Sequence, residues 1–212
     1  MSYAPPVRGI MLAKGSSRRL HRKNMCDFLG APLFTRNLAK MVGLDLLPIV
    51  DSDDSEILDV AEQAGAVPHL RAHEFRGADV ATQPIVKAAF EALEIRSPTC
   101  AVIVQANSPN LSRATLERAI AIIRHTPVHE VMSAFPDGTH NGSVWAISHE
   151  RLFSYGDPYR HRPDVLLVDD SIDIHHAAEL ELALELEAKS DRRPYFDVRA
   201  PDPSISQAYE LS

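Results

Sequence analysis

Short apolar runs alternate with segments of helical periodicity along most of this 212-residue chain. The clearest strand is TCAVIVQ (99–105), a continuous β-branched run that ends in a polar residue. The clearest helix is TQPIVKAAFEALE (82–94), whose apolar residues recur on one face. This alternation predicts an α/β fold, a three-layer sandwich around a mainly parallel sheet. Other strands are expected over 7–12, 46–51, 128–135, 142–148 and 164–169, and other helices over 32–44, 55–65, 113–125 and 175–190.

In parallel sheets of this kind, ligands bind beyond the carboxyl ends of the strands. That rule selects the loops AKGSSRRLHRKN, DSDD, QANSP and DDSIDIH, which follow residues 12, 51, 105 and 169. The first loop is strongly basic, although the chain has a formal net charge of −7 at pH 7. Glycine and serine N–H groups can surround an anion, and guanidinium groups match phosphate oxygens. The loop therefore predicts a triphosphate site, with a solvated basic loop as the alternative; it matches neither the Walker A nor the GxGxxG pattern.

Composition narrows the classes of function. The acidic balance argues against a general nucleic-acid binder. No apolar run has the length of a membrane span, and MSYAPPVRG lacks the apolar core of a signal peptide. Cys26 and Cys100 form no CxxC pair, which argues against a disulfide framework or a zinc site. We expect a cytoplasmic enzyme or binding protein with neither nucleic acid nor membrane as a partner.

The basic loop also resembles a known signature. LAKGSSRRLHRKN (12–24) is similar to (P/A)ARGGSKRIPxKN of the acylneuraminate cytidylyltransferase family, the CMP-sialic acid and CMP-KDO synthetases. VDSDDSEILDVAEQAGA (50–66) resembles the family's VSTDDEEIAxxAxxxGA, and DDSIDIHHAAELELA (169–183) resembles its xSIDIDTxxDLxxA. Further similar segments, found in the same order, are 70–93, 102–120 and 141–148. The similar segments run in order over roughly residues 8–188 of the chain.

The resemblance implies the nucleotide-diphospho-sugar transferase fold, which is GT-A-like and Rossmann-like, over 1–190. Residues 191–212 contain prolines and little periodicity, and are expected to be an arm or tail. The resemblance also implies that CMP passes from CTP to an acidic acceptor with release of pyrophosphate, in the presence of Mg²⁺, and that the protein is a homodimer. The acceptor would be a nonulosonic or keto-sugar acid. Alternatives are a small phosphonate acceptor, or a nucleotide-binding regulator that has lost activity. The basic residues Arg160, His161 and Arg162 suit an anionic acceptor.

The candidate nucleotide site centres on the basic loop. Lys14, Arg18 and Lys23 are expected to bind the triphosphate and to act in catalysis. Asn24 is expected to contact cytosine or ribose, or else to cap the next segment. The further nucleotide-binding candidates, some of them backbone groups, are Ala13, Gly15, Ser16, Ser17, Arg71 and Gln105. For Arg71, an exposed loop arginine without such a role is the alternative. Asp53 and Asp54 are expected to hold a loop and cap the helix over 55–65.

The candidate catalytic carboxylate is Asp173, which the resemblance assigns to Mg²⁺. The family's second carboxylate position is His175 here, and Mg²⁺ rarely takes imidazole. His175 is therefore a candidate for acceptor contact, proton relay or water-mediated metal contact, or else caps the last helix. Asp169 or Asp170 could supply the missing charge. The acceptor-binding candidates are Gln105, Ser108 and His175.

Overall fold

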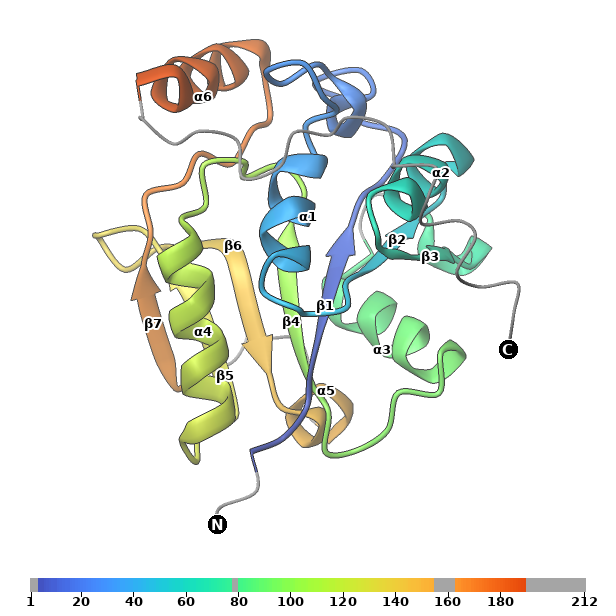
Figure 1. Cartoon of the computed structure of the whole chain (residues 1–212), viewed down its shortest axis with the longest axis vertical. Helices are drawn as coiled ribbons and strands as arrows, with labels where there is room; N and C mark the ends of the chain where they lie inside the picture. Colours follow the sequence, from blue (N-terminus) through green and yellow to red (C-terminus); the bar gives the residue numbers. More distant parts are fainter. Residues whose placement is uncertain (1–3, 78–79, 155–162, 190–212) are drawn as a thin grey trace, which may run out of the picture.

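A seven-stranded sheet forms the centre of the protein (Figure 1). The computed structural model describes residues 4–77, 80–154 and 163–189. The strand order is β3-β2-β1-β4-β6-β5-β7, and β6 alone among these runs antiparallel to its neighbours. The strands are β1 (Val7–Leu12), β2 (Ile49–Ser52), β3 (Val67–Leu70), β4 (Cys100–Gln105), β5 (Glu130–Ala134), β6 (His140–Ile147) and β7 (Val165–Val168).

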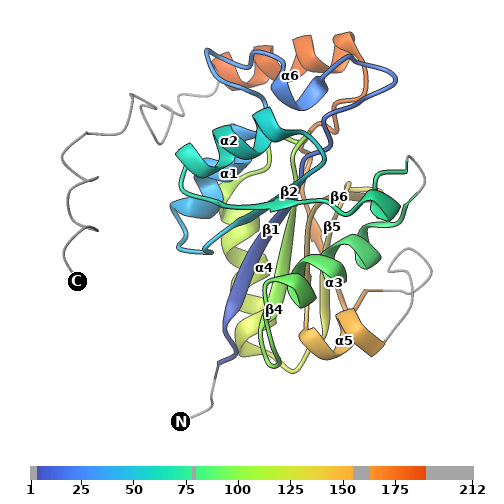
Figure 2. The ribbon, with the colours of Figure 1, turned by 90° about the vertical axis from the view of Figure 1, so that its right-hand side faces the viewer.

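Helices cover both faces of the sheet, which gives the expected three layers (Figure 2). On one face lie α1 (Thr35–Val42), α2 (Ser55–Gln63) and α4 (Arg113–His125), and their buried apolar residues share a core with β1, β2 and β4. On the other face lie α3 (Thr82–Ala92) and α5 (His149–Ser154), which bury Phe90 and Leu152 against Ile10 and Ile103. Central strands with both faces covered are apolar throughout, as β4 is.

The last helix, α6 (Ala177–Lys189), lies beyond the carboxyl edge of the sheet beside the loop that follows β1 (Figures 1 and 2). Its buried Ala183 packs in a small core with Phe28, Leu33 and Ile174. An ion pair between Arg36 on α1 and the buried Glu187 also anchors it. The helix therefore closes over the edge where the candidate site lies.

The strand ends at this edge are level with one another. In the sheet register, Leu12 pairs with Asp51 on one side and Gln105 on the other, and Asp51 pairs with His69. One row across four strands thus reads His69, Asp51, Leu12, Gln105. The loops that leave β1, β2 and β4 start from the same height, so their side chains can meet over the sheet.

Most of the elements expected from the sequence are present, some with the expected bounds and others shifted by a few residues. The 46–51 strand begins only at Ile49, and the 32–44 helix only at Thr35. In the described part of the chain, the strand β3 and the helix α5 were missed, as were the 3₁₀ helices over Lys23–Met25 and His73–Phe75; β3 contains a proline, which edge strands tolerate, and α5 has six residues. The expected arm at 191–212 and the basic residues Arg160, His161 and Arg162 lie outside the described residues.

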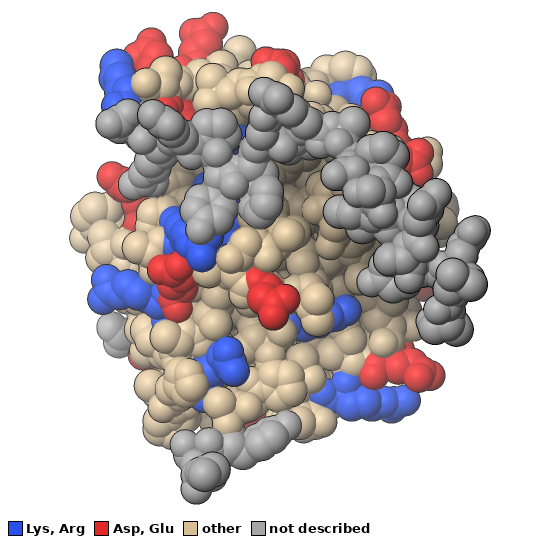
Figure 3. All heavy atoms as spheres, in the orientation of Figure 1, with Lys and Arg blue, Asp and Glu red and all other residues tan. Residues whose placement is uncertain are grey.

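Surface charge is mixed on the face seen in Figure 3, where basic and acidic side chains alternate and do not form one basic patch. Within the described ranges, no helix combines the length and the apolar character needed to cross a membrane.

Candidate active site

The four predicted loops meet at the carboxyl edge of the sheet. Gly15 N–H, after β1, donates to Asp53 Oδ1, after β2, over 2.8 Å. Asn107, after β4, donates through its amide to an oxygen of Asp173, after β7. Lys23 Nζ donates over 2.5 Å to the carbonyl of Ile174. Loops that are far apart in the chain therefore lie together at the edge where ligands were expected to bind.

The cations of the loop after β1 differ in what they contact. The side chains of Lys14 and Arg18 make no hydrogen bond or ion pair with any described residue, and Arg18 is exposed. Arg22 pairs with Asp54 and Glu56 over 3.0 and 2.7 Å. Arg19 reaches His175, with 2.8 Å between its NH2 and the ring Nδ1. Lys14 and Arg18 are therefore available to an anion, whereas Arg22 fixes the loop to the start of α2.

Asp53 and Asp54, in the loop after β2, are structural, as predicted. Asp54 is the N-cap of α2, and its side chain accepts from Glu56 N–H. A Cβ on Gly15 would lie 2.5 Å from Asp54 Cβ, so only glycine fits there. These contacts correct one expectation, because the Gly15 N–H already donates to Asp53 and is not free for a phosphate. Within the described chain, the N–H groups of Ser16 and Ser17 have no partner.

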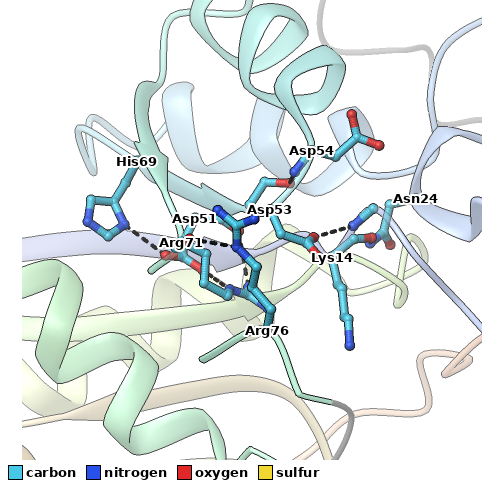
Figure 4. Close-up of polar contacts among 10 residues, drawn as sticks. Lys14, Asn24, Asp51, Asp53, Asp54, His69, Arg71 and Arg76 are labelled. Atoms are coloured by element: carbon cyan, nitrogen blue, oxygen red, sulfur yellow. Dashed lines mark hydrogen bonds and ion pairs between the residues drawn. The ribbon is translucent and has the colours of Figure 1, made fainter. Parts of the chain in front are cut away.

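Asn24 has a buried acceptor without a partner (Figure 4). Its Nδ2 donates to the carbonyl of Lys14 over 2.8 Å, which fixes the amide orientation because a carbonyl only accepts. Its Oδ1 is buried and has no hydrogen-bond partner among the residues that the structure describes. Nor does Asn24 cap the 3₁₀ helix over Lys23–Met25, whose N-cap is Arg22. A buried acceptor left unpaired is costly, and a ligand hydroxyl or amine would relieve that cost.

Asp173 has a hydrogen-bond donor on each carboxylate oxygen. Asn107 donates to Oδ1, and His175 Nε2 lies 2.9 Å from Oδ2. Because Arg19 can only donate, His175 Nδ1 acts as the acceptor, and the ring proton on Nε2 points to Asp173. The ring does not cap α6. Instead, Glu179 Oε2 accepts from the backbone N–H groups of His175 and His176 over 2.5 and 2.6 Å.

Burial shifts the pKa values of Asp173 and Lys23 in opposite directions. It raises the pKa of Asp173, against the attraction of His175 and Lys23. It lowers the pKa of Lys23, against the attraction of Asp173. Both shifts favour the neutral forms, because burial outweighs the pairing. A bound phosphate would favour charged Lys23, and a bound cation would favour ionised Asp173.

The carboxylates of the site fit a metal ion only together with a substrate. Among the described residues, no group of three or more His, Cys, Asp or Glu side chains could hold a metal ion. Asp169 is buried and accepts from Thr115 Oγ1 and Ser171 N–H, so it does not supply the missing charge. Mg²⁺ is commonly held by one or two carboxylates plus substrate phosphates. Asp173 matches the single-carboxylate case, with phosphate oxygens as the other ligands.

The three remaining candidates, Gln105, Ser108 and Arg71, differ in burial and in hydrogen-bond partners. The Gln105 side chain, at the end of β4, makes no hydrogen bond to a described residue. Ser108 is fully buried, so its hydroxyl is out of reach of an acceptor in this arrangement, and the expected contact is corrected accordingly. Arg71 is not an exposed loop arginine, because it is 4 % exposed and pairs with Asp51.

Sequence reasoning missed three residues that contact this site. Asp51, His69 and Asn107 were not singled out as site residues. Their contacts join residues 18, 20 and 66 positions apart, which local periodicity does not reveal. The available signal was positional, since Asp51 and Asn107 stand where strands that point at the site end.

Comparison with known proteins identifies the family. The sequence model of the family described as Cytidylyltransferase matches residues 9–177. Pseudaminic acid cytidylyltransferase of Campylobacter jejuni is 31% identical over 117 residues, which are 52% of this chain and 50% of that protein. The chain thus spans about half the length of the curated relatives it matches.

Solved structures agree on the fold. CMP:2-keto-3-deoxy-manno-octonic acid synthetase complexed with CTP has a TM-score of 0.68 at 12% identity, covering 86% of this chain and 98% of that one. Rv0371c from Mycobacterium tuberculosis, in complex with manganese, has a TM-score of 0.63 at 16% identity, covering 86% and 99%. The fold is that of the nucleotide-diphospho-sugar transferases. With the family match extending over most of its length, the chain belongs to the cytidylyltransferase family.

Proposed function

We propose that this protein transfers CMP from CTP to a nonulosonic or keto-sugar acid and releases pyrophosphate. The observation that carries the proposal is the contact between the basic loop and the Asp173 segment, through Lys23 to Ile174 and Arg19 to His175. Cations suited to a triphosphate lie at the same edge of the sheet as a carboxylate suited to a metal ion. Nucleotidyl transfer depends mainly on such charge balance and on the placement of the reactants.

The proposed reaction is an in-line displacement at the α-phosphorus of CTP. The acceptor hydroxyl oxygen forms the new bond, and the bond from the α-phosphorus to the oxygen bridging the β-phosphate breaks. The electron pair of that bond leaves with pyrophosphate, and the hydroxyl proton passes to solvent. Negative charge builds on the leaving group, which nearby cations stabilise.

In this proposal, Lys14, Arg18 and Lys23 balance the triphosphate, together with the N–H groups of Ser16 and Ser17. Lys14 and Arg18 suit this role because their side chains have no partner among the described residues. Gly15 and Ala13 are left with indirect roles, since their N–H groups donate to Asp53 and to the Asp51 carbonyl.

The nucleoside would be held by side chains with unused hydrogen-bonding groups. Asn24 Oδ1 would accept from cytosine or ribose, and the Gln105 amide is free to pair with the base or the acceptor. His175, which lies beside the half-buried Asp173, would contact the acceptor. Ser108 is no longer included among the acceptor contacts, because it is buried.

A divalent cation completes the proposed site. When bound, Mg²⁺ would supply charge neutralisation on the triphosphate, and Asp173 would hold it together with phosphate oxygens. The manganese complex of Rv0371c supports a divalent ion in a protein of this fold. The choice of Mg²⁺ follows from the family resemblance.

A sugar acid is favoured as the acceptor by the named relatives, which act on pseudaminic acid, and by the synthetase of 2-keto-3-deoxy-manno-octonic acid. A phosphonate acceptor and an inactive regulator find no support of this kind. The homodimer, the cytoplasmic location, the absence of nucleic-acid and membrane partners, and a catalytic domain over 1–190 with a tail at 191–212 stay predictions.

The preference among nucleotides tests the part of the proposal that names CTP as the substrate. We expect CTP with Mg²⁺ to raise the melting temperature more than ATP, GTP or UTP, because a ligand stabilises a protein only through affinity for its native state. Thermal-shift titrations with the four nucleotides measure this preference. Equal stabilisation by all four would contradict a site that selects cytosine.

A further inference from the structure

A buried polar cluster lies at the ends of β2 and β3, beside the basic loop (Figure 4). Asp51 is 1 % exposed and Arg71 is 4 % exposed. Arg71 Nε donates to Asp51 Oδ1, and its NH2 lies 3.2 Å from the Asp51 carbonyl. His69 Nδ1 lies 2.7 Å from the other carboxylate oxygen, Oδ2. Each oxygen of Asp51 therefore faces a donor from the neighbouring strand or the loop that follows it.

Stability alone is a weak explanation for this cluster. Taking two charges out of water is costly, and a buried ion pair is often no better than apolar residues of the same volume. Moreover, Asp51 stands where the resembled pattern VSTDD has serine, so this position does not require a carboxylate to form the strand end. The buried carboxylate of Asp51 therefore points to a function for the Arg71 guanidinium that it holds.

The Arg71 guanidinium has unused donors at the edge where the site lies. A guanidinium carries five N–H groups, and two of them reach Asp51. The others make no hydrogen bond to a described residue. Figure 4 shows Arg71, Lys14 and Asn24 in one view of the carboxyl edge, with Asp53 between Arg71 and Lys14. Its backbone is held as well, with Arg71 N–H bonded to Ser52 O over 2.8 Å and Arg76 Nε donating to Arg71 O over 3.1 Å.

We propose that Asp51 is a positioning residue that fixes the Arg71 guanidinium for hydrogen bonds to CTP. The inference rests on the proposed function. His69 supports it by occupying Asp51 Oδ2, so that the carboxylate cannot rotate away from Arg71. An arginine fixed before the ligand arrives loses less conformational freedom on binding than a mobile one.

The test compares two buried carboxylates that pair with arginine. Asp51→Asn keeps the shape but weakens the hold on Arg71. Glu130→Gln is the matched control, because Glu130 is fully buried, pairs with Arg151 over 3.0 Å and has no contact with the loops of the site. Calorimetric titration with CTP and Mg²⁺, together with thermal melting and steady-state kinetics, gives the readouts.

We expect Asp51→Asn to weaken CTP binding about tenfold or more, as for a lost hydrogen bond to a charged group. KM for CTP should rise while kcat stays close to that of the unaltered protein, the mark of lost ground-state binding. Glu130→Gln should lower the melting temperature and leave the CTP Kd unchanged. Because Asp51 acts through Arg71, the double change Asp51→Asn with Arg71→Gln should bind CTP as Arg71→Gln alone does.

A lower melting temperature with an unchanged CTP Kd in Asp51→Asn would overturn the inference and leave the cluster a purely structural pair. Should Asp51→Asn not fold, Arg71→Gln removes the guanidinium that Asp51 holds, and an unchanged CTP Kd in that variant would overturn the inference equally. A chain that does not bind CTP in its unaltered form would contradict the proposed function instead.

Discussion

At the residue scale, the cations of one loop have separate tasks. Lys14 and Arg18 have no described partner, Arg22 holds α2, and Arg19 and Lys23 contact the Asp173 segment. The sequence predicts the charge of this loop, because charge is local. It does not predict the partners, which for Arg22 and Lys23 are 32 and 151 positions away.

Replacing two of these cations should separate binding from stability. We expect Arg18→Ala to raise KM for CTP about tenfold, as for a lost contact with a charged group, without a change in melting temperature. Lys23→Ala should weaken CTP use and also lower the melting temperature, because Lys23 donates to Ile174. Arg22→Ala is the control within the same loop, with CTP kinetics preserved. An equal loss of CTP use in Arg22→Ala would show that loop shape, and not the individual charges, governs binding.

Asp173 should be the most sensitive carboxylate. Asp173→Asn removes a charge and a hard ligand but keeps the shape, and we expect kcat to fall about 100-fold or more. Asp170→Asn, at an exposed position three residues earlier, is the control and should be nearly neutral. Initial rates over a range of Mg²⁺ concentrations measure both variants. Similar kinetics in the two would move the catalytic centre elsewhere.

The variant His175→Asp tests the role of His175, which stands at the position of the family's second carboxylate. The change removes the partner of Arg19 and places a second negative charge beside Asp173. We expect KM for the anionic acceptor to rise through repulsion, with Mg²⁺ dependence unchanged. His176→Asp, at the exposed neighbour, serves as the control. Tighter Mg²⁺ dependence with an unchanged acceptor KM would instead make residue 175 a metal position.

At the element scale, periodicity predicts long elements better than short ones. The helix expected over 113–125 is α4 with the same bounds, and the strand expected over 7–12 is β1. The edge strand β3 was missed, because four residues with a proline carry too little pattern to distinguish them from a loop. That omission hid the register that sets His69 beside Asp51.

The start of α6 is stabilised by Glu179, and its effect should depend on pH. The backbone N–H of His175 is the main cause of the lowered pKa of Glu179, so its ionised form stabilises the fold. This stability is present above the ordinary value of 4.5 and is lost as pH falls through the lowered pKa. We expect Glu179→Ala to cost about 0.5–1 kcal/mol at pH 7 and much less in acid.

Thermal melts of Glu179→Ala at pH 7 and below pH 4.5 check this dependence. Glu181→Ala, which is exposed on the same helix, is the control and should show little effect at either pH. A deficit in Glu179→Ala that persists in acid would mean that the carboxylate charge is not what caps the helix.

At the scale of the whole molecule, strand–helix alternation predicts both the fold and the edge that carries the site. The positions of the four loops followed from topology alone, because parallel strands deliver their carboxyl ends to one edge. The pairings within that edge did not follow, since Asp51 with Arg71 and Asn107 with Asp173 depend on the register and on the path of 169–176. Burial was equally hidden, as the fully buried Ser108 shows.

The central claim is CMP transfer from CTP to a sugar acid. Its most direct test is pyrophosphate release from CTP and Mg²⁺ with a panel of nonulosonic acids, keto-sugar acids and phosphonates, with the CMP-linked product identified by mass spectrometry. The account predicts release that requires a sugar acid, matches the product mole for mole, and is lost in Asp173→Asn. Folded protein that binds CTP but releases no pyrophosphate with any acceptor, or does so only with phosphonates, would contradict it.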